Sequence, residues 1–259
     1  MIELNHRKKL RAINLKDNYF AKSINLEDPG YDVVYYFHCS EKGPDSKVFN
    51  TIFVDLQQPE EDILNSFSKT NKKTIRSLLK SNEIQISIED TPSDEDIEEF
   101  ADFFDRFAKE KGIFLCDRNL VSNLNKISSL TIGKACYKED ILSFMLFIRN
   151  NERVTGQYEA SGRFFFAHDP EKVKMASKAN RILEYMCMLH FKKRGLKIYD
   201  LGGVTLDPND EEKANIDMRK KGFGGELVKE YHFMYPLTVK GKTFIYLKKI
   251  SERLKGNND

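Results

Sequence analysis

The stretch TIGKACYKEDILSFMLFIRNNERVTGQYEA (residues 131–160) decides the fold class. It contains three runs rich in apolar residues, at 131–137, 142–149 and 153–160, which short polar turns separate. Runs of this length with turn residues between them are typical of β-strands joined by hairpins. The sequence therefore predicts three consecutive antiparallel strands.

A helix and a fourth strand are expected directly after this stretch. Residues 178–194 place apolar side chains at a helical spacing, and Gly195 is a typical stop signal. Residues 197–201 (KIYDL) indicate a short strand that ends in two glycines. Hairpin-linked strands followed by one strand–helix–strand crossover are unlike the doubly wound dinucleotide-binding fold. We expect an α/β protein whose central sheet is mixed and mostly antiparallel.

The flanking segments predict further elements. Strands are expected at 31–37, 48–56, 84–88, 226–235 and 243–248, with another at 163–167, and helices at 59–80, 93–112 and 119–128. The first two strands indicate a small N-terminal sheet. We therefore expect a reduced N-terminal lobe over 1–57 and one larger α/β domain over 58–259.

Composition restricts the class of protein. The 259 residues carry 42 Lys and Arg against 40 Asp and Glu, a net charge of +2, which argues against a general nucleic-acid coat. No apolar run approaches the roughly 20 residues of a membrane span, and no signal peptide is evident. The four cysteines and five histidines show no metal-ligand spacing. We expect a cytoplasmic protein without a metal site or disulfide framework.

The first candidate site is a basic helix face. Lys69, Lys73 and Arg76 share one side of the expected helix with two further lysines, and no acidic residue lies among them. Lys and Arg bind phosphate groups through charge and donated hydrogen bonds, so this face is a candidate for substrate phosphates. A solvated helix face is the alternative.

The second candidate follows the strand at 197–201. Asp200 lies at its carboxyl end, and Gly202-Gly203 permit close approach of backbone to a ligand. Asp200 is a candidate proton acceptor, and a plain turn in which it bonds local amides is the alternative.

Two more segments combine polar groups with glycines. In RKKGFGG (residues 219–225) three cations and three glycines surround Phe223, and Lys220 is a candidate for holding a phosphate or an oxyanion. In GQYEAS (residues 156–161) Glu159 is a candidate base. The neighbouring aromatic residues Tyr158 and Phe223 are candidate substrate contacts. A basic turn and an edge strand are the respective alternatives. The sequence contains no GxSxG elbow, Walker A loop or GxGxxG motif, so hydrolase, kinase and dehydrogenase functions have no support.

Several of these segments together resemble the FemABX-type acyltransferases, which have a GNAT-like fold. The similarity spans roughly residues 50–235. It is carried by SKT at 68–70, FAKEKGI at 107–113, KANRILEY at 178–185, FKKRG at 191–195 with YDLGG at 199–203, and KKGFGGELV at 220–228. The resemblance implies an enzyme that transfers aminoacyl groups from aminoacyl-tRNA to an amine of a peptidoglycan precursor. By that match Lys220 is the position associated with substrate phosphates and the reacting centre, and Asn180 and Arg181 on the similar long helix are candidate substrate contacts.

The chain departs from the family pattern in four places. The N-terminal part is too short for a complete first lobe, a helical-hairpin insertion of some members is absent, and Arg219 stands where the signature usually has Phe. The stretch 168–178 contains no glycine, which disfavours the pyrophosphate loop of coenzyme A-dependent GNAT enzymes. We expect a cell-envelope acyl- or aminoacyltransferase with no cofactor, a phosphate-bearing acceptor and aminoacyl-tRNA as a possible donor. The alternatives are an acyl-CoA-dependent N-acyltransferase for an amino sugar or small amine, and a non-catalytic binding module.

Overall fold

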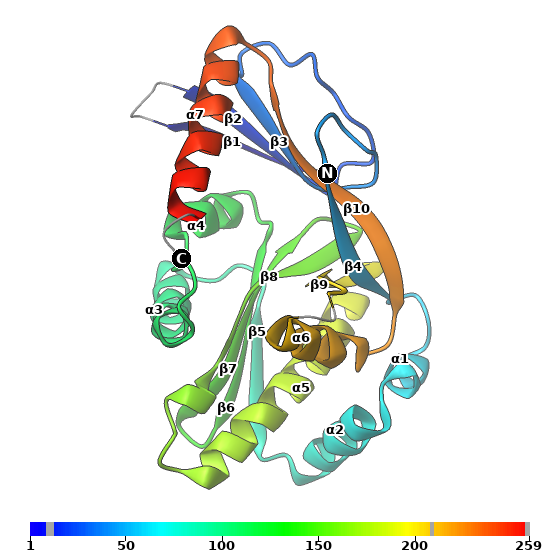
Figure 1. Ribbon diagram of the computed structural model, residues 1–259. Helices are drawn as coiled ribbons and strands as arrows, with labels where there is room; N and C mark the ends of the chain where they lie inside the picture. The colour runs from blue at the N-terminus through cyan, green and yellow to red at the C-terminus, as the bar shows by residue number, and fades with distance from the viewer. Residues whose placement is uncertain (9–12, 208–209, 257–259) are drawn as a thin grey trace. The chain divides into compact units, whose positions relative to one another are not determined.

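The computed structural model describes residues 1–8, 13–207 and 210–256 (Figure 1). The chain forms two compact units, which are described separately. Unit 1 comprises 1–50 and 228–259, and unit 2 comprises 51–227. The sequence had grouped the C-terminal segment with the larger domain, whereas the structure groups it with the N-terminal strands, because strand pairing joins the two ends of the chain.

Unit 1 contains a mixed sheet covered by one helix. Its elements are β1 (Ile2–Lys8), β2 (Ile13–Tyr19), β3 (Val33–Cys39), most of β10 (Glu226–Pro236) and α7 (Val239–Gly256). β1 pairs antiparallel with β2, β2 parallel with β3, and β3 antiparallel with β10. Ile13, Leu15 and Val33 form a buried cluster with Phe244 and Ile245 of α7. The strand predicted at 243–248 is therefore wrong, and this segment is helical.

Unit 2 contains the larger sheet, with strand order β4-β9-β8-β7-β6-β5. Its strands are β4 (Lys47–Asp55), β5 (Ile84–Glu89), β6 (Leu130–Tyr137), β7 (Asp140–Arg149), β8 (Arg153–Ser161) and β9 (Ile198–Val204). The pairs from β5 to β8 are antiparallel, and β8 pairs parallel with β9. The three hairpin-linked strands and the mixed, mostly antiparallel sheet are thus confirmed.

Helices cover both faces of this sheet (Figure 1). They are α1 (Glu60–Ser66), α2 (Lys69–Ser81), α3 (Asp94–Lys111), α4 (Arg118–Lys126), α5 (Pro170–Lys193) and α6 (Glu211–Lys221). The α5 helix packs on β6 and β7, and α3 packs on β8 and β7 from the other side. The main core cluster lies between the sheet and α5, with Phe147 and Phe191 in edge contact at 5.3 Å. No helix within the described ranges combines the length and apolar character needed to cross a bilayer.

Three local predictions for unit 2 differ from the structure. The helix expected at 59–80 is two helices, because Ser68 caps α2 by accepting a hydrogen bond from the Asn71 amide. The segment expected as a strand at 163–167 contains a 3₁₀ turn, Gly162–Phe164. The α5 helix starts at Pro170 instead of 178, because Asp169 caps it and proline is favourable in the first turn.

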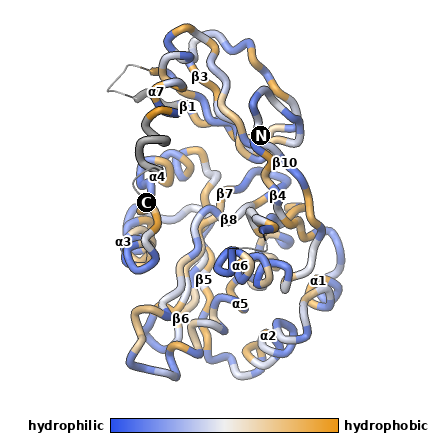
Figure 2. The backbone as a smooth tube through the Cα atoms, viewed as in Figure 1, coloured by the Kyte–Doolittle hydropathy of each residue, from blue (hydrophilic) through white to orange (hydrophobic). Residues whose placement is uncertain are grey.

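The α6 helix has no counterpart among the predicted elements. Its residues are hydrophilic along most of its length (Figure 2), and Asp217 is the one buried residue between Glu211 and Lys221. Two sets of hydrogen bonds hold this helix in place. Asp210 caps it by accepting from the Lys213 amide, and the Asp217 carboxylate accepts from the Thr205 and Leu206 amides at 3.1 and 2.8 Å. This helix, not a loop, carries the cations at 219–221.

Candidate functional site

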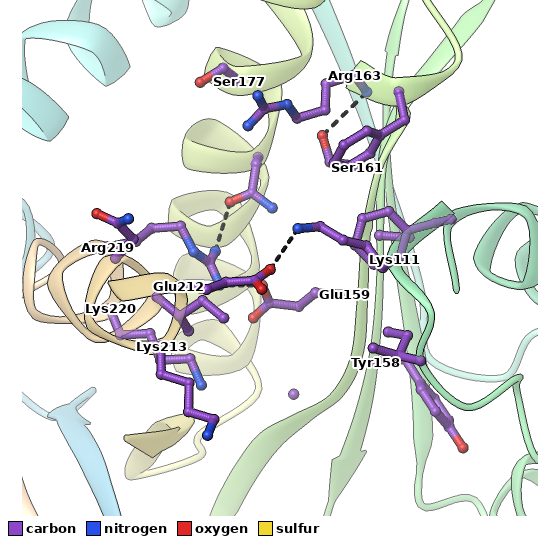
Figure 3. Close-up of a pocket in the computed structure, with 18 of the residues that line it drawn as sticks. Lys111, Tyr158, Glu159, Ser161, Arg163, Ser177, Glu212, Lys213, Arg219 and Lys220 are labelled. Carbon is purple, nitrogen blue, oxygen red and sulfur yellow. Dashed lines mark hydrogen bonds and ion pairs between the residues drawn. The ribbon is translucent and has the colours of Figure 1, made fainter. Parts of the chain in front are cut away.

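A pocket of about 820 Å³ lies within unit 2 (Figure 3). Its walls are the end of β8 with the following 3₁₀ turn, the first half of α5, the inner side of α6 and the end of α3. Six cationic side chains and three acidic ones line it: Lys111, Arg163, Arg181, Lys213, Arg219 and Lys220, with Glu159, Asp210 and Glu212. The pocket therefore favours an anionic ligand, although the whole chain is nearly neutral.

An arginine–glutamate pair occupies the pocket wall between β8 and α6. The Arg219 guanidinium donates to Glu159 Oε2 at 2.6 Å and to Asn180 Oδ1 at 3.0 Å (Figure 3). Burial alone would raise the pKa of Glu159, but the charges of Arg219 and Lys220 outweigh it and hold that pKa below its ordinary value. Glu159 is therefore a carboxylate at neutral pH, better suited to binding an ammonium group than to removing its proton.

Lys220 lies one residue further along α6. Its ammonium donates to the Gly203 carbonyl at 2.8 Å. Burial lowers the pKa of Lys220 below its ordinary value, while Glu159 partly opposes this shift and Arg219 adds to it. Gly202, with φ +76°, makes room for this arrangement, since a Cβ there would lie 3.2 Å from Lys220 Nζ. The two glycines thus bring backbone close to Lys220.

A second carboxyl group lies in the core near this site. Glu184 on α5 is only 3% exposed and accepts a hydrogen bond from the buried Tyr199 hydroxyl at 2.7 Å. Burial raises the pKa of Glu184 to about 7, and the neighbouring Glu159 carboxylate adds to the shift. Neither residue is a predicted site residue, because both have the spacing of ordinary core positions.

Asp200 is fully buried and does not line the pocket. Its carboxylate accepts from the Thr51 hydroxyl, from the Gly202 amide at 2.8 Å and from Arg153 at 2.5 Å. Only the Gly202 amide is a local partner of the kind expected in a turn; Thr51 and Arg153 are distant in sequence, and Asp200 lies within β9. We therefore do not retain Asp200 among the catalytic candidates.

Two aromatic candidates have different surroundings. Phe223 is 1% exposed and packs edge-on against Phe67 at 5.3 Å, so it is a core residue instead of a substrate contact. Tyr158 lines the pocket, but its hydroxyl accepts from the Asp117 amide at 3.2 Å, and its ring packs against Phe104. Figure 3 shows the Tyr158 side chain directed away from Glu159.

The basic face of α2 is separate from the pocket. Lys69, Lys73 and Arg76 are exposed and are not among the pocket-lining residues. Arg76 pairs with Glu61 of α1 at 2.9 Å, so the preceding helix supplies an acidic partner. The structure thus brings Lys220, Glu159, Tyr158, Asn180, Arg181 and the neighbouring Gly202-Gly203 together, and leaves the α2 face out.

Several pocket residues are not among the site residues predicted from the sequence. Arg219 is one of the three cations in RKKGFGG and a departure from the family signature, and the structure makes it the central cation of the site. Lys111 and Glu212 form an ion pair of 2.7 Å between α3 and α6 (Figure 3). Arg163, Ser161 and Ser177 also line the pocket. Only the cationic cluster at 219–221 offered a sequence signal for this group.

Comparisons with known proteins establish the fold. The scan against protein-family models gave no match. The search of curated proteins gave none either. Among solved structures, the chain is similar to FemX (TM-score 0.57, 14% identity), covering 72% of this chain and 61% of the FemX chain. The chain thus spans about three fifths of FemX.

Two further structures cover more of the chain. One is the C-terminal domain of a putative lysylphosphatidylglycerol synthetase from Agrobacterium fabrum (TM-score 0.54, 10% identity; 94% of this chain and 87% of that chain). The other is L-PGS from Bacillus licheniformis (TM-score 0.51, 14% identity; 81% and 69%). The chain therefore has the FemABX/GNAT-like acyltransferase fold that its motifs resemble. One fold supports many different reactions, so the chemistry of the pocket decides the function.

Proposed function

We propose that this protein is an acyl- or aminoacyltransferase that joins an activated acyl group to an amine. The observation that carries the proposal is one pocket that holds a partly buried lysine, Lys220, beside a carboxylate, Glu159, in an acyltransferase fold. Ionisable groups with shifted pKa values that gather in a cleft are typical of functional sites. A non-catalytic module with a filled cleft would have neither the open volume nor these groups.

The reaction needs a neutral amine, a polarised carbonyl and fixed geometry. The amine nitrogen bonds to the acyl carbon, and the bond from that carbon to the leaving oxygen or sulfur breaks. Lys220 has three N–H donors, of which the Gly203 carbonyl accepts one, so it has donors with which to stabilise the oxyanion. Glu159 binds the acceptor in its ammonium form, which releases one proton to bulk water before the attack and stays hydrogen-bonded to Glu159 as the neutral amine. After the attack the leaving group takes the second proton, because a carboxylate paired with Arg219 is a weak base.

The start of α5 favours an aminoacyl ester over acyl-CoA as donor. In CoA-dependent GNAT enzymes a glycine-rich loop binds the pyrophosphate before this helix. Here residues 170–178 are helical, and the Asp169 carboxylate already accepts from the Glu171 and Lys172 amides, each at 3.1 Å. These amides are the groups that would bind a pyrophosphate, and a carboxylate in their place repels one. We therefore propose aminoacyl-tRNA as donor.

The positive excess of the pocket supports a phosphate-bearing acceptor. A cell-envelope precursor or a sugar nucleotide with a free amine has the required charge and amine group. The similarity to FemX and to lysylphosphatidylglycerol synthetase agrees with this class of reaction. We propose that the acceptor amine binds at Glu159 and its phosphate elsewhere in the same pocket.

Transfer assays with two donor classes test the proposal. The wild-type protein, Lys220→Ala and Lys221→Ala are incubated with labelled aminoacyl-tRNA or with a panel of acyl-CoA thioesters and phosphorylated amines. Lys221 is exposed and does not line the pocket, so its variant is the matched control. We expect transfer from aminoacyl-tRNA, a fall in kcat of about 100-fold for Lys220→Ala and little change for Lys221→Ala. Near-normal turnover in Lys220→Ala would contradict the assignment, and transfer from acyl-CoA alone would establish the conventional GNAT reaction.

A further inference from the structure

One end of the pocket carries two arginines whose contacts are with neutral groups. The Arg181 guanidinium donates to Asn71 Oδ1 at 3.1 Å and to the carbonyl and hydroxyl oxygens of Ser177 at 2.8 and 3.3 Å. Arg163 lies over the Phe164 ring at 5.2 Å. Over the described part of the chain, neither arginine forms an ion pair with a carboxylate. Both side chains line the pocket.

Arg181 contacts the Ser177 hydroxyl from the next turn of α5, and the Arg163 side chain points toward the same serine from the turn after β8 (Figure 3). Ser161, at the end of β8, adds a second hydroxyl to the same stretch of the pocket wall. The geometry thus places two guanidinium groups and two hydroxyl groups around one region of the cavity.

The position of Arg181 has an electrostatic cost that a nearby anion would reduce. Burial lowers the pKa of Arg181, and the charge of Arg219 lowers it further. Neither the hydroxyl groups nor the amide of Asn71 neutralises this charge. Guanidinium groups match the oxygens of a phosphate group in geometry, and serine hydroxyls donate to the same oxygens.

We propose that Arg163, Arg181, Ser161 and Ser177 form a phosphate subsite for one of the two substrates. The inference rests on the proposed function and deepens it, because the subsite fixes the phosphate at one end of the pocket while Glu159 and Lys220 hold the reacting groups at the other. The anion is bound by side chains two turns inside α5, and not by the amides at its N-terminus, which Asp169 occupies.

Calorimetric titration with inorganic pyrophosphate tests the subsite without any acyl donor. The proteins compared are the wild type, Arg163→Gln, Arg181→Gln, the double variant and Arg106→Gln. Arg106 is an exposed arginine that stacks on Phe165 at 4.1 Å and does not line the pocket, so it is the matched control for a lost surface charge. We expect pyrophosphate to bind the wild type, roughly fivefold to tenfold weaker binding in each single variant, and unchanged binding in Arg106→Gln.

Three results would overturn the subsite: no pyrophosphate binding by the wild type, undiminished binding by the double variant, or equal weakening by Arg106→Gln. Arg181 also contacts Asn71, so thermal unfolding of each variant is measured to detect a loss of stability. If Arg181→Gln does not fold, the exposed Arg163→Gln still tests the subsite. Competition between pyrophosphate and each substrate shows which one carries the phosphate. A protein that binds pyrophosphate through these arginines yet transfers no acyl group would count against the proposed function alone.

Discussion

Glu159 and Glu184 show how two carboxyl groups near the same cations acquire opposite properties. Glu159 accepts from Arg219 at 2.6 Å, and its pKa is lowered. Glu184 is buried and accepts from the neutral Tyr199 hydroxyl, and burial raises its pKa. An ion pair stabilises the charged form of one group, whereas desolvation penalises the charged form of the other. The site therefore holds one carboxylate and one group that titrates near neutrality.

The raised pKa of Glu184 predicts a loss of stability with rising pH. The pKa is about 7 in the folded protein against an ordinary value of 4.5, so between these values the folded state binds more protons than the unfolded state. The free energy of unfolding then falls as pH rises from about 4.5 to 7, by on the order of 2 kcal/mol, and levels off above that range. Urea unfolding at a series of pH values measures this slope.

Glu184→Gln removes the titrating group and keeps an acceptor for Tyr199. We expect this variant to lose the slope between pH 5 and 7, and the exposed Glu83→Gln to retain it. Glu159 has a lowered pKa, so its contribution to the free energy of unfolding changes with pH in the opposite direction. That contribution is lost only as pH falls below about 4.5. An unchanged slope in Glu184→Gln would show that another group titrates.

At the residue scale, the sequence predicted which residue types form the site better than it predicted which of them face the pocket. Residue type and neighbouring glycines indicated Glu159 and Lys220, and the family resemblance indicated Asn180 and Arg181; all four line the pocket. Asp200 and Phe223 had equally suggestive neighbours, yet both are buried in the interior. Which side of a strand or turn faces a cavity depends on contacts distant in sequence, such as that between Thr51 and Asp200, and local pattern does not encode it.

At the element scale, apolar runs and helical periodicity predicted the elements that contribute to the core. The strands β6, β7 and β8 match their predicted ranges because each is an apolar run bounded by polar turns, and β7 is buried continuously along most of its length. Most of α5 matches because its apolar residues repeat with the helix period. The α6 helix was missed because polar contacts, and not an apolar stripe, hold it. In α7, the adjacent apolar residues at 244–247 favour a strand locally, and packing against β2 overrides that preference.

The cap of α5 predicts a result that separates stability from ligand binding. Asp169→Ala removes the acceptor for the Glu171 and Lys172 amides, so we expect a loss of about 1 kcal/mol in the free energy of unfolding. Pyrophosphate affinity should not fall, because the proposed subsite uses side chains further along the helix. Chemical unfolding and calorimetric titration of the same variant measure both quantities. Glu171→Ala is the control, because Glu171 is exposed and its replacement keeps the Asp169 cap. A large loss of pyrophosphate affinity in Asp169→Ala alone would contradict the placement of the subsite.

At the scale of the whole molecule, the two ends of the chain fold together. Unit 1 consists of residues 1–50 and 228–259, and unit 2 is the continuous segment between them. The proposed site residues all lie in unit 2, while the C-terminal helix α7 completes the core of unit 1. A change in α7 should therefore act on the N-terminal strands, which are more than 200 residues away in sequence.

Phe244→Ala tests this organisation. Phe244 is 9% exposed and packs with Ile13, Leu15 and Val33, so its truncation should leave a cavity and cost about 3 kcal/mol in the stability of unit 1. Hydrogen exchange should become faster in β2 and β3 and stay unchanged in β6 and β7. Tyr246→Ala, on the same helix but 66% exposed, should have little effect on either set of strands. Equal acceleration in β6 and β7 would mean that the two units unfold as one cooperative body, because then the loss of a unit 1 contact would be felt throughout the chain.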